Sequence, residues 1–211
     1  MGKCSKAVLV ASLAGVLVSG GVEARGDADV LIPREVLFGN PDRTSVRISP
    51  DGTRLSYLAP VDGVMNVWVA PVDRLDAARP VTSDRVRGVR NYFWSYSNDE
   101  IVYLQDAGGD ENWQLFITNV DDARTRNLTP IEEIIDPATG RPMIEPSTGK
   151  KLKPTVRIQE AAPESPDEIL IGLNNRDPRF HDLHRLNLRT GTMDLVQEND
   201  GFAGFATDHD Y

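Results

Sequence analysis

The sequence is poor in the residues that most enzyme sites use. Its 211 residues include one cysteine and three histidines. Cys4 alone forms no intrachain disulfide and no zinc site built on several cysteines. The nucleophile motif G-x-S-x-G of the α/β-hydrolases is absent, so we expect no serine–histidine–aspartate triad and no catalytic residue in this chain. We also expect no metal and no cofactor.

Positive charge is scarce as well. The sequence has 23 lysines and arginines against 32 aspartates and glutamates, which gives a formal net charge of −9. An acidic surface repels phosphate backbones, so we expect no nucleic acid partner. The hydrophobic fraction of 40% and the charged fraction of 26% are ordinary for a folded globular domain.

The longest apolar run lies near the N-terminus. Residues 7–18 (AVLVASLAGVLV) follow Lys3 and Lys6 and precede small residues that end at Ala24. This order is typical of a signal peptide, and the run is too short to span a bilayer comfortably. A buried helix or an uncleaved anchor is the alternative. We predict a signal peptide at 1–24, export to the periplasm or the medium, and no membrane contact after cleavage.

Three later segments repeat one pattern. Each contains a Ser-x-Asp turn signal and two alternating apolar runs, and the segments cover 49–73, 97–121 and 165–191. A short apolar run precedes the signal, and another closes the unit. Four short strands that recur every 40 to 50 residues are typical of a β-propeller blade. An all-β sandwich with accidental similarity is the alternative.

We therefore predict an all-β fold, a partial β-propeller of four-stranded blades. It has about three blades plus the first strand of a fourth, which we expect in residues 201–211. The predicted segments are a lead-in at 25–44, an incomplete propeller domain at 45–211 with blades at about 45–83, 89–130 and 155–197, and an insertion at 131–154. Because propellers close with about four to eight blades, we expect this chain to be part of a longer protein.

Several stretches together resemble a known family. They are IPREVLF, SPDGTRLSYL, the GDEN that follows IVYLQD, RNLTP and NNRDPRFHDLHRLNLRTG. These resemble the N-terminal propeller of serine peptidases of the prolyl oligopeptidase family, in its acylaminoacyl-peptidase and dipeptidyl-aminopeptidase-like branch. The insertion at 131–154 departs from that pattern.

The resemblance implies a peptide substrate and a C-terminal α/β-hydrolase domain that carries serine, aspartate and histidine as its triad. This chain would then be inactive alone, and its propeller would gate or dock substrate for the missing domain. A non-enzymatic periplasmic binding propeller of the TolB type is the alternative, because SPDG blades suit both.

The stretch DAGGDEN (106–112) is the main candidate site. Its glycines and flanking polar residues predict a hairpin turn, while a metal loop is disfavoured because the regular ligand spacing of an EF-hand is absent. The remaining hypothesis is recognition, with Asp110, Glu111, Asn112 and Arg176 contacting substrate or the catalytic domain. The competing interpretation is that Arg176, Arg179 and His181 only pair with acids of the neighbouring blade. His181 and His184 are three apart on a predicted strand, so joint metal binding is not expected.

The signal peptide gives the first testable prediction. Cleavage after Ala24 leaves a mature chain that begins at Arg25, because the small residues before that bond suit signal peptidase. Mass spectrometry of the exported protein should find this N-terminus. A mature chain that still begins at Met1 would contradict the predicted localisation.

Overall fold

The computed structural model describes residues 32–39 and 41–208, which fall into two units described separately. The first unit, Met1–Gly39, contributes the helix α1 (Arg34–Phe38), in which the amides of Val36 and Leu37 donate to the carbonyl of Pro33. This helix lies within the predicted lead-in at 25–44. The predicted signal peptide lies outside the described residues. Within those residues, no helix is long and apolar enough to cross a membrane.

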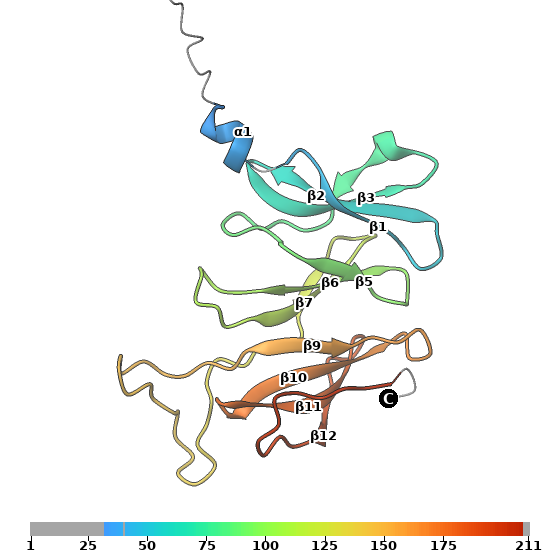
Figure 1. The fold of residues 1–211 in the computed structure, drawn as a ribbon. Helices are drawn as coiled ribbons and strands as arrows, with labels where there is room; N and C mark the ends of the chain where they lie inside the picture. Colours follow the sequence, from blue (N-terminus) through green and yellow to red (C-terminus); the bar gives the residue numbers. More distant parts are fainter. Residues whose placement is uncertain (1–31, 40, 209–211) are drawn as a thin grey trace, which may run out of the picture. The chain divides into compact units, whose positions relative to one another are not determined.

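The second unit, Asn40–Tyr211, contains three antiparallel sheets of four strands each (Figure 1). The first sheet contains β1 (Thr44–Ile48), β2 (Arg54–Val61), β3 (Val64–Pro71) and β4 (Arg79–Pro80), with the 3₁₀ turn η1 (Leu75–Ala77) between the last two. The second contains β5 (Tyr92–Trp94), β6 (Glu100–Gln105), β7 (Gln114–Asn119) and β8 (Thr125–Asn127). The third contains β9 (Val156–Glu160), β10 (Glu168–Asp177), β11 (Phe180–Asn187) and β12 (Met193–Gln197). In every sheet, spatial order follows chain order, so each is an up-and-down blade and the predicted fold class is confirmed.

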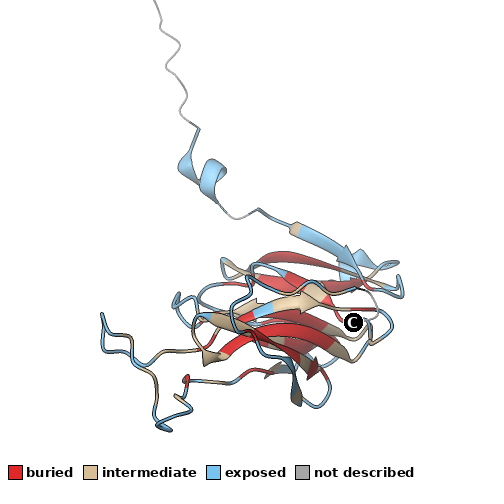
Figure 2. Cartoon of the chain, turned by 60° about the horizontal axis from the view of Figure 1, so that its bottom comes forward, coloured by how far each residue is buried: buried red, intermediate tan, exposed pale blue. Residues whose placement is uncertain are grey.

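The three sheets pack face to face through two apolar cores. Successive side chains of a strand point to opposite faces, so the middle sheet serves both cores. Ile101 and Tyr103 of β6 pack with the first sheet, while Val102 between them packs with the third. Figure 2 shows the buried residues concentrated in the strands, whereas β1 and the segment 131–154 are mostly exposed. Each sheet thus depends on its neighbour for burial.

One hydroxyl links the first two blades inside their shared core. The Ser56 side chain of β2 is fully buried and accepts hydrogen bonds from Tyr92 Oη at 2.9 Å and Trp94 Nε1 at 2.8 Å. Tyr92 Oη also lies 2.7 Å from the Ser45 carbonyl, so its single proton is shared between these two acceptors. Buried polar groups stabilise a fold only when they are paired. Ser56 satisfies both aromatic donors, so it fixes how the second blade packs on the first.

The repeat begins at different points in the first two copies. The Ser49 amide donates to the Arg54 carbonyl, and in the second blade it is Ser95, not Ser97, whose amide donates to the carbonyl of Glu100. The left-handed turn residues agree, because Gly52 and Asn98 both have φ of 73°. The sequence alignment that matched Ser49 with Ser97 is therefore wrong by two residues. Ser97 instead matches Asp51, and its hydroxyl donates to Asp99.

The hairpins between second and third strands lie at the end of the sheets where one blade connects to the next. Arg87 of the connection 81–91 contacts Asp106 of the β6–β7 hairpin, and Lys153 of the insertion contacts Asp110. The loop 106–112 therefore lies on the same face as these blade connections. The insertion itself folds as two small turns with bridges Ile135↔Pro142 and Ile144↔Lys151. Each turn contains one copy of a short sequence repeat, DPATGR at 136–141 and EPSTGK at 145–150.

The segment predicted to open a fourth blade runs beside the third. Gln159 of β9 donates to the Phe205 carbonyl at 2.7 Å, and Thr207 Oγ1 donates to Glu160 at 3.3 Å. Between residues 198 and 208 the structure assigns no strand. The contacts in this stretch are made mainly by side chains, so it covers β9 without extending its sheet.

Removing the Ser56 hydroxyl should destabilise the packing of the first two blades. Ser56→Ala leaves Trp94 Nε1 buried without its acceptor and removes one of two acceptors from Tyr92. We expect a loss of about 1–3 kcal/mol in the free energy of unfolding, because an orphaned buried donor costs that much. Urea unfolding of the chain measures it. The matched control, Ser147→Ala in the exposed insertion, should change stability little, and equal effects of both variants would refute the role of Ser56.

Candidate functional site

The loop 106–112 is a hairpin turn that the buried carboxylate of Asp106 stabilises. It joins β6 and β7, and Gly108 and Gly109 have φ of 67° and 93°, which only glycine adopts readily. The Asp106 side chain is 2% exposed, accepts from the Glu111 amide at 3.2 Å and lies 3.6 Å from Arg87 Nε. A Cβ at Gly109 would lie 3.1 Å from Arg87 Nη1. The predicted turn and the capping role of Asp106 are both present.

Asp110 is paired with the insertion. Its carboxylate accepts from Lys153 Nζ at 3.0 Å and from the Asn112 amide at 3.1 Å. Partial burial raises the pKa of Asp110, but the hydrogen bonds from Lys153 and Asn112 outweigh it and lower that pKa below its ordinary value. Asn112 Nδ2 in turn donates to the Asp110 carbonyl at 2.9 Å. Asp110 and Asn112 therefore use their polar groups to shape the loop.

Glu111 differs from its neighbours. It has φ of 58°, a left-handed conformation that a residue with a side chain adopts rarely. The residue is exposed, and no hydrogen bond or ion pair joins its carboxylate to the part of the chain that the structure describes. Strain of this kind costs about 1–3 kcal/mol and is concentrated at functional sites. The loop thus presents one free negative charge at its tip.

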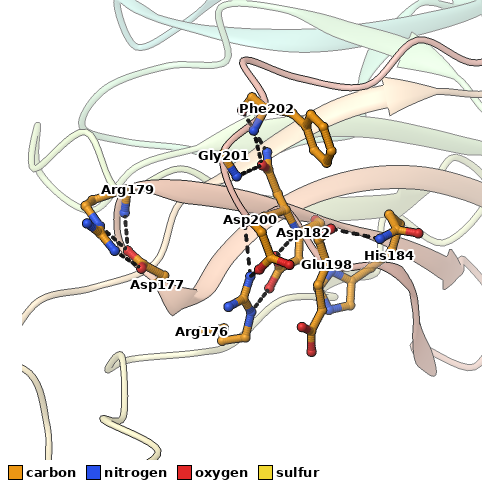
Figure 3. A network of polar contacts seen from close by, with 11 residues as sticks. Arg176, Asp177, Arg179, Asp182, His184, Glu198, Asp200, Gly201 and Phe202 are labelled. Carbon is orange, nitrogen blue, oxygen red and sulfur yellow. Dashed lines mark hydrogen bonds and ion pairs between the residues drawn. The ribbon is translucent and has the colours of Figure 1, made fainter.

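Arg176 lies on another hairpin and has its own partners (Figure 3). Its Nε and Nη2 donate to the two oxygens of Asp182, each at 2.8 Å, and Nη2 also donates to the Asn199 carbonyl. Asp182 is 2% exposed and additionally accepts from the Asn199 amide at 2.7 Å. These bonds raise the pKa of Arg176 and fix the chain where it leaves β12.

The expected ion pairs between neighbouring blades take a different form. Arg179 pairs with Asp177 of its own hairpin, with Nη2 2.7 Å from the carboxylate. Like Arg176, it does not contact the loop 106–112. The cations that do so come from Arg87 and Lys153, because the connecting segments lie closer to that loop than the third blade does. Sequence spacing carried no signal for either pair.

The two histidines of the third blade are in different environments. His184 is buried, with Nδ1 3.2 Å from the Asp182 carbonyl, whereas Nε2 of His181 is buried without a partner. Burial, and to a smaller extent the positive charge of Arg157, lowers the pKa of His181 from 6.5 to about 4. The described residues contain no group of three or more side chains suited to hold a metal ion.

The three sheets and their loops are consecutive blades of a β-propeller. Proteins of similar sequence show the family to which this propeller is related. The chain is 41% identical over 182 residues to dipeptidyl aminopeptidase BIII of Pseudoxanthomonas mexicana, a match that covers 86% of this chain and 24% of that protein. It is 31% identical over 181 residues to dipeptidyl peptidase family member 6 of Caenorhabditis elegans, which covers 85% of the chain and 22% of that protein. The chain is thus related to the N-terminal propeller portion of the prolyl oligopeptidase family, which confirms the resemblance seen in its sequence.

The chain spans less than a quarter of the length of these curated relatives. No family model matches the sequence. Among solved structures, the β-propeller domain of the Trilobed protease from Pyrococcus furiosus aligns with a TM-score of 0.45 and 14% identity, over 74% of this chain and 44% of that one.

The His181 environment predicts a pH dependence of stability. The unfolded chain takes up a proton near pH 6.5, while folded His181 stays neutral down to about pH 4. Stability is therefore lost as the pH falls through this window. His181→Gln should flatten the plot of unfolding free energy against pH between these two values, as measured by urea unfolding. An unchanged slope would show that His181 is not responsible.

Proposed function

We propose that this chain is the N-terminal part of the propeller of an exported serine peptidase. The propeller would gate or dock peptide substrates for a C-terminal α/β-hydrolase domain. The support is the identity of 41% and 31% to two proteins that are both named as dipeptidyl peptidases. That agreement favours a peptidase over a binding propeller of the TolB type. The chemistry would reside in the hydrolase domain, since this sequence holds no G-x-S-x-G.

Within this function, Glu111 is the residue that meets a cation. The observation that carries the proposal is the contrast inside one loop, where Asp106 and Asp110 are paired and Glu111 is exposed, strained and unpaired. Arg87 and Lys153 neutralise Asp106 and Asp110, whereas no cation of the described structure pairs with the third acid. The free carboxylate is then available to an incoming group.

The amino terminus of a peptide is the cation that fits best. The relatives are named a dipeptidyl aminopeptidase and a dipeptidyl peptidase, and an aminopeptidase must recognise the free amino end of its substrate. An arginine of the catalytic domain is the competing partner. A carboxylate–cation pair that becomes desolvated on binding loses about 2–5 kcal/mol when one partner is truncated, whereas an exposed acid contributes less than about 1 kcal/mol. Asp110, Asn112 and Arg176 complete the proposed contact region by holding the loops in place.

Replacing Glu111 tests the assignment in the full-length enzyme. Glu111→Gln removes the charge and keeps the shape, so we expect kcat/KM for peptides with a free amino terminus to fall at least about tenfold. The melting temperature should stay unchanged, because the carboxylate has no partner in the described structure. Glu164→Gln, at an exposed position between β9 and β10, is the matched control and should leave the kinetics unchanged.

Asp106→Asn should have the opposite effect. It weakens a carboxylate that is 2% exposed and contacts both Arg87 and the Glu111 amide, so we expect a loss of about 1–3 kcal/mol in stability. Unfolding experiments measure the stability, and pull-down with the separate hydrolase domain measures docking. If Glu111→Gln changes neither the kinetics nor the docking, the loop is only a turn.

A further inference from the structure

Three arginines from the three blades converge on one groove. Arg47 lies on β1, Arg90 lies two residues before β5, and Arg157 lies on β9. The groove has a volume of about 620 Å³, and its lining combines these cations with aromatic side chains: Arg47, Arg90, Arg157, Tyr92, Phe93 and Trp113. The three arginines are exposed, so their charges face the groove and the solvent.

Two of these arginines lie over aromatic rings instead of pairing with acids. The guanidinium carbon of Arg47 lies 5.5 Å from the centre of the Tyr92 ring, and that of Arg90 lies 5.7 Å from the Trp113 ring. Within residues 32–39 and 41–208, neither of them nor Arg157 forms an ion pair. Seven other arginines of the propeller pair with carboxylates: Arg54, Arg87, Arg126, Arg176, Arg179, Arg185 and Arg189. Within the described residues of the propeller, six more form no ion pair: Arg43, Arg74, Arg79, Arg85, Arg124 and Arg141. The groove is therefore distinguished by gathering three unpaired arginines in one lining.

The absence of acids around this groove is unusual in a chain with 32 aspartates and glutamates against 23 lysines and arginines. Three neighbouring cations repel one another unless an anion lies between them. Arg47 and Arg90 lie over Tyr92 and Trp113, and within the described residues their guanidinium N–H groups donate no hydrogen bond. A guanidinium donates two parallel hydrogen bonds to a carboxylate. The cluster is therefore preorganised for an anionic ligand.

We propose that this groove binds a peptide segment that carries carboxylate side chains. The arginines would take the carboxylates, while the rings of Tyr92, Phe93 and Trp113 would contact apolar atoms of the same peptide. The aromatic lining favours a ligand that carries both carboxylates and apolar groups. This deepens the proposed function, on which it rests for the choice of peptide, by assigning acidic peptides as a preferred class.

Binding to the full-length protein, with the serine of its hydrolase domain replaced, tests the groove without catalysis. The probe is a fluorescein-labelled peptide Ala-Glu-Phe-Asp-Ala, compared by fluorescence anisotropy with its amide counterpart Ala-Gln-Phe-Asn-Ala. We expect the acidic peptide to bind at least about tenfold more tightly, and its affinity to fall as salt is added, because exposed charges are screened. Equal affinity for the two peptides would overturn the proposal.

Matched variants locate the binding. Arg90→Gln and Arg157→Gln should each weaken the acidic peptide at least about fivefold, since each removes one charge–charge contact. Arg74→Gln, at an exposed position between β3 and β4, should leave the affinity unchanged, and circular dichroism checks that all variants fold. If Arg74→Gln weakens binding as much as the groove variants do, the attraction is general and the groove is not the site.

A single-stranded oligonucleotide that carries the same fluorescein label serves as a second anionic probe. We expect it to bind more weakly than the acidic peptide, and binding of equal strength would show an unspecific anion surface and refute the peptide assignment. Loss of peptidase activity in Glu111→Gln with intact binding in this assay would support both proposals. Normal kinetics in Glu111→Gln with intact binding would refute the role of Glu111 and leave the groove standing.

Discussion

The face-to-face packing of four-stranded sheets is the constraint on which the rest of this structure depends. A single antiparallel sheet has two faces and no core of its own. The middle sheet solves this by alternation, since Ile101 and Tyr103 point to one neighbour and Val102 to the other. The hairpins between second and third strands and the connecting segments lie on one face because each sheet has four antiparallel strands in chain order.

Much of this architecture is readable from the sequence for a physical reason. Blade strands alternate apolar and polar residues, and turn residues such as Ser, Asp and Gly mark their ends. The boundaries are harder, because different residues perform the same task. Asn98 occupies the left-handed position that Gly52 fills in the first blade, so matching identical letters displaces the repeat by two residues. The helix α1 is missed because its five residues are too few to show a helical period.

The candidate site shows the limit of local reasoning. The charges of DAGGDEN are visible in the sequence, and so is the turn. Which acid is free is decided by Arg87 and Lys153, which reach the loop from the connecting segments. Arg176 likewise pairs with Asp182 of β11, the second strand of its own hairpin. Net charge has the same weakness, since a total of −9 gives no indication of three unpaired arginines in one groove.

The loop that carries Glu111 is attached to the propeller at points outside its own hairpin. Lys153 of the insertion pairs with Asp110, and the Thr155 hydroxyl just beyond it accepts from the Trp113 amide at 3.0 Å. Residues 131–154 are mostly exposed and contribute little to the cores between the sheets. Changes in the length or composition of this segment can therefore move the tip of the neighbouring loop at little cost to the stability of the blades. The insertion is thus a separate element that sets the position of this loop, while the buried strands alone determine the packing between the sheets.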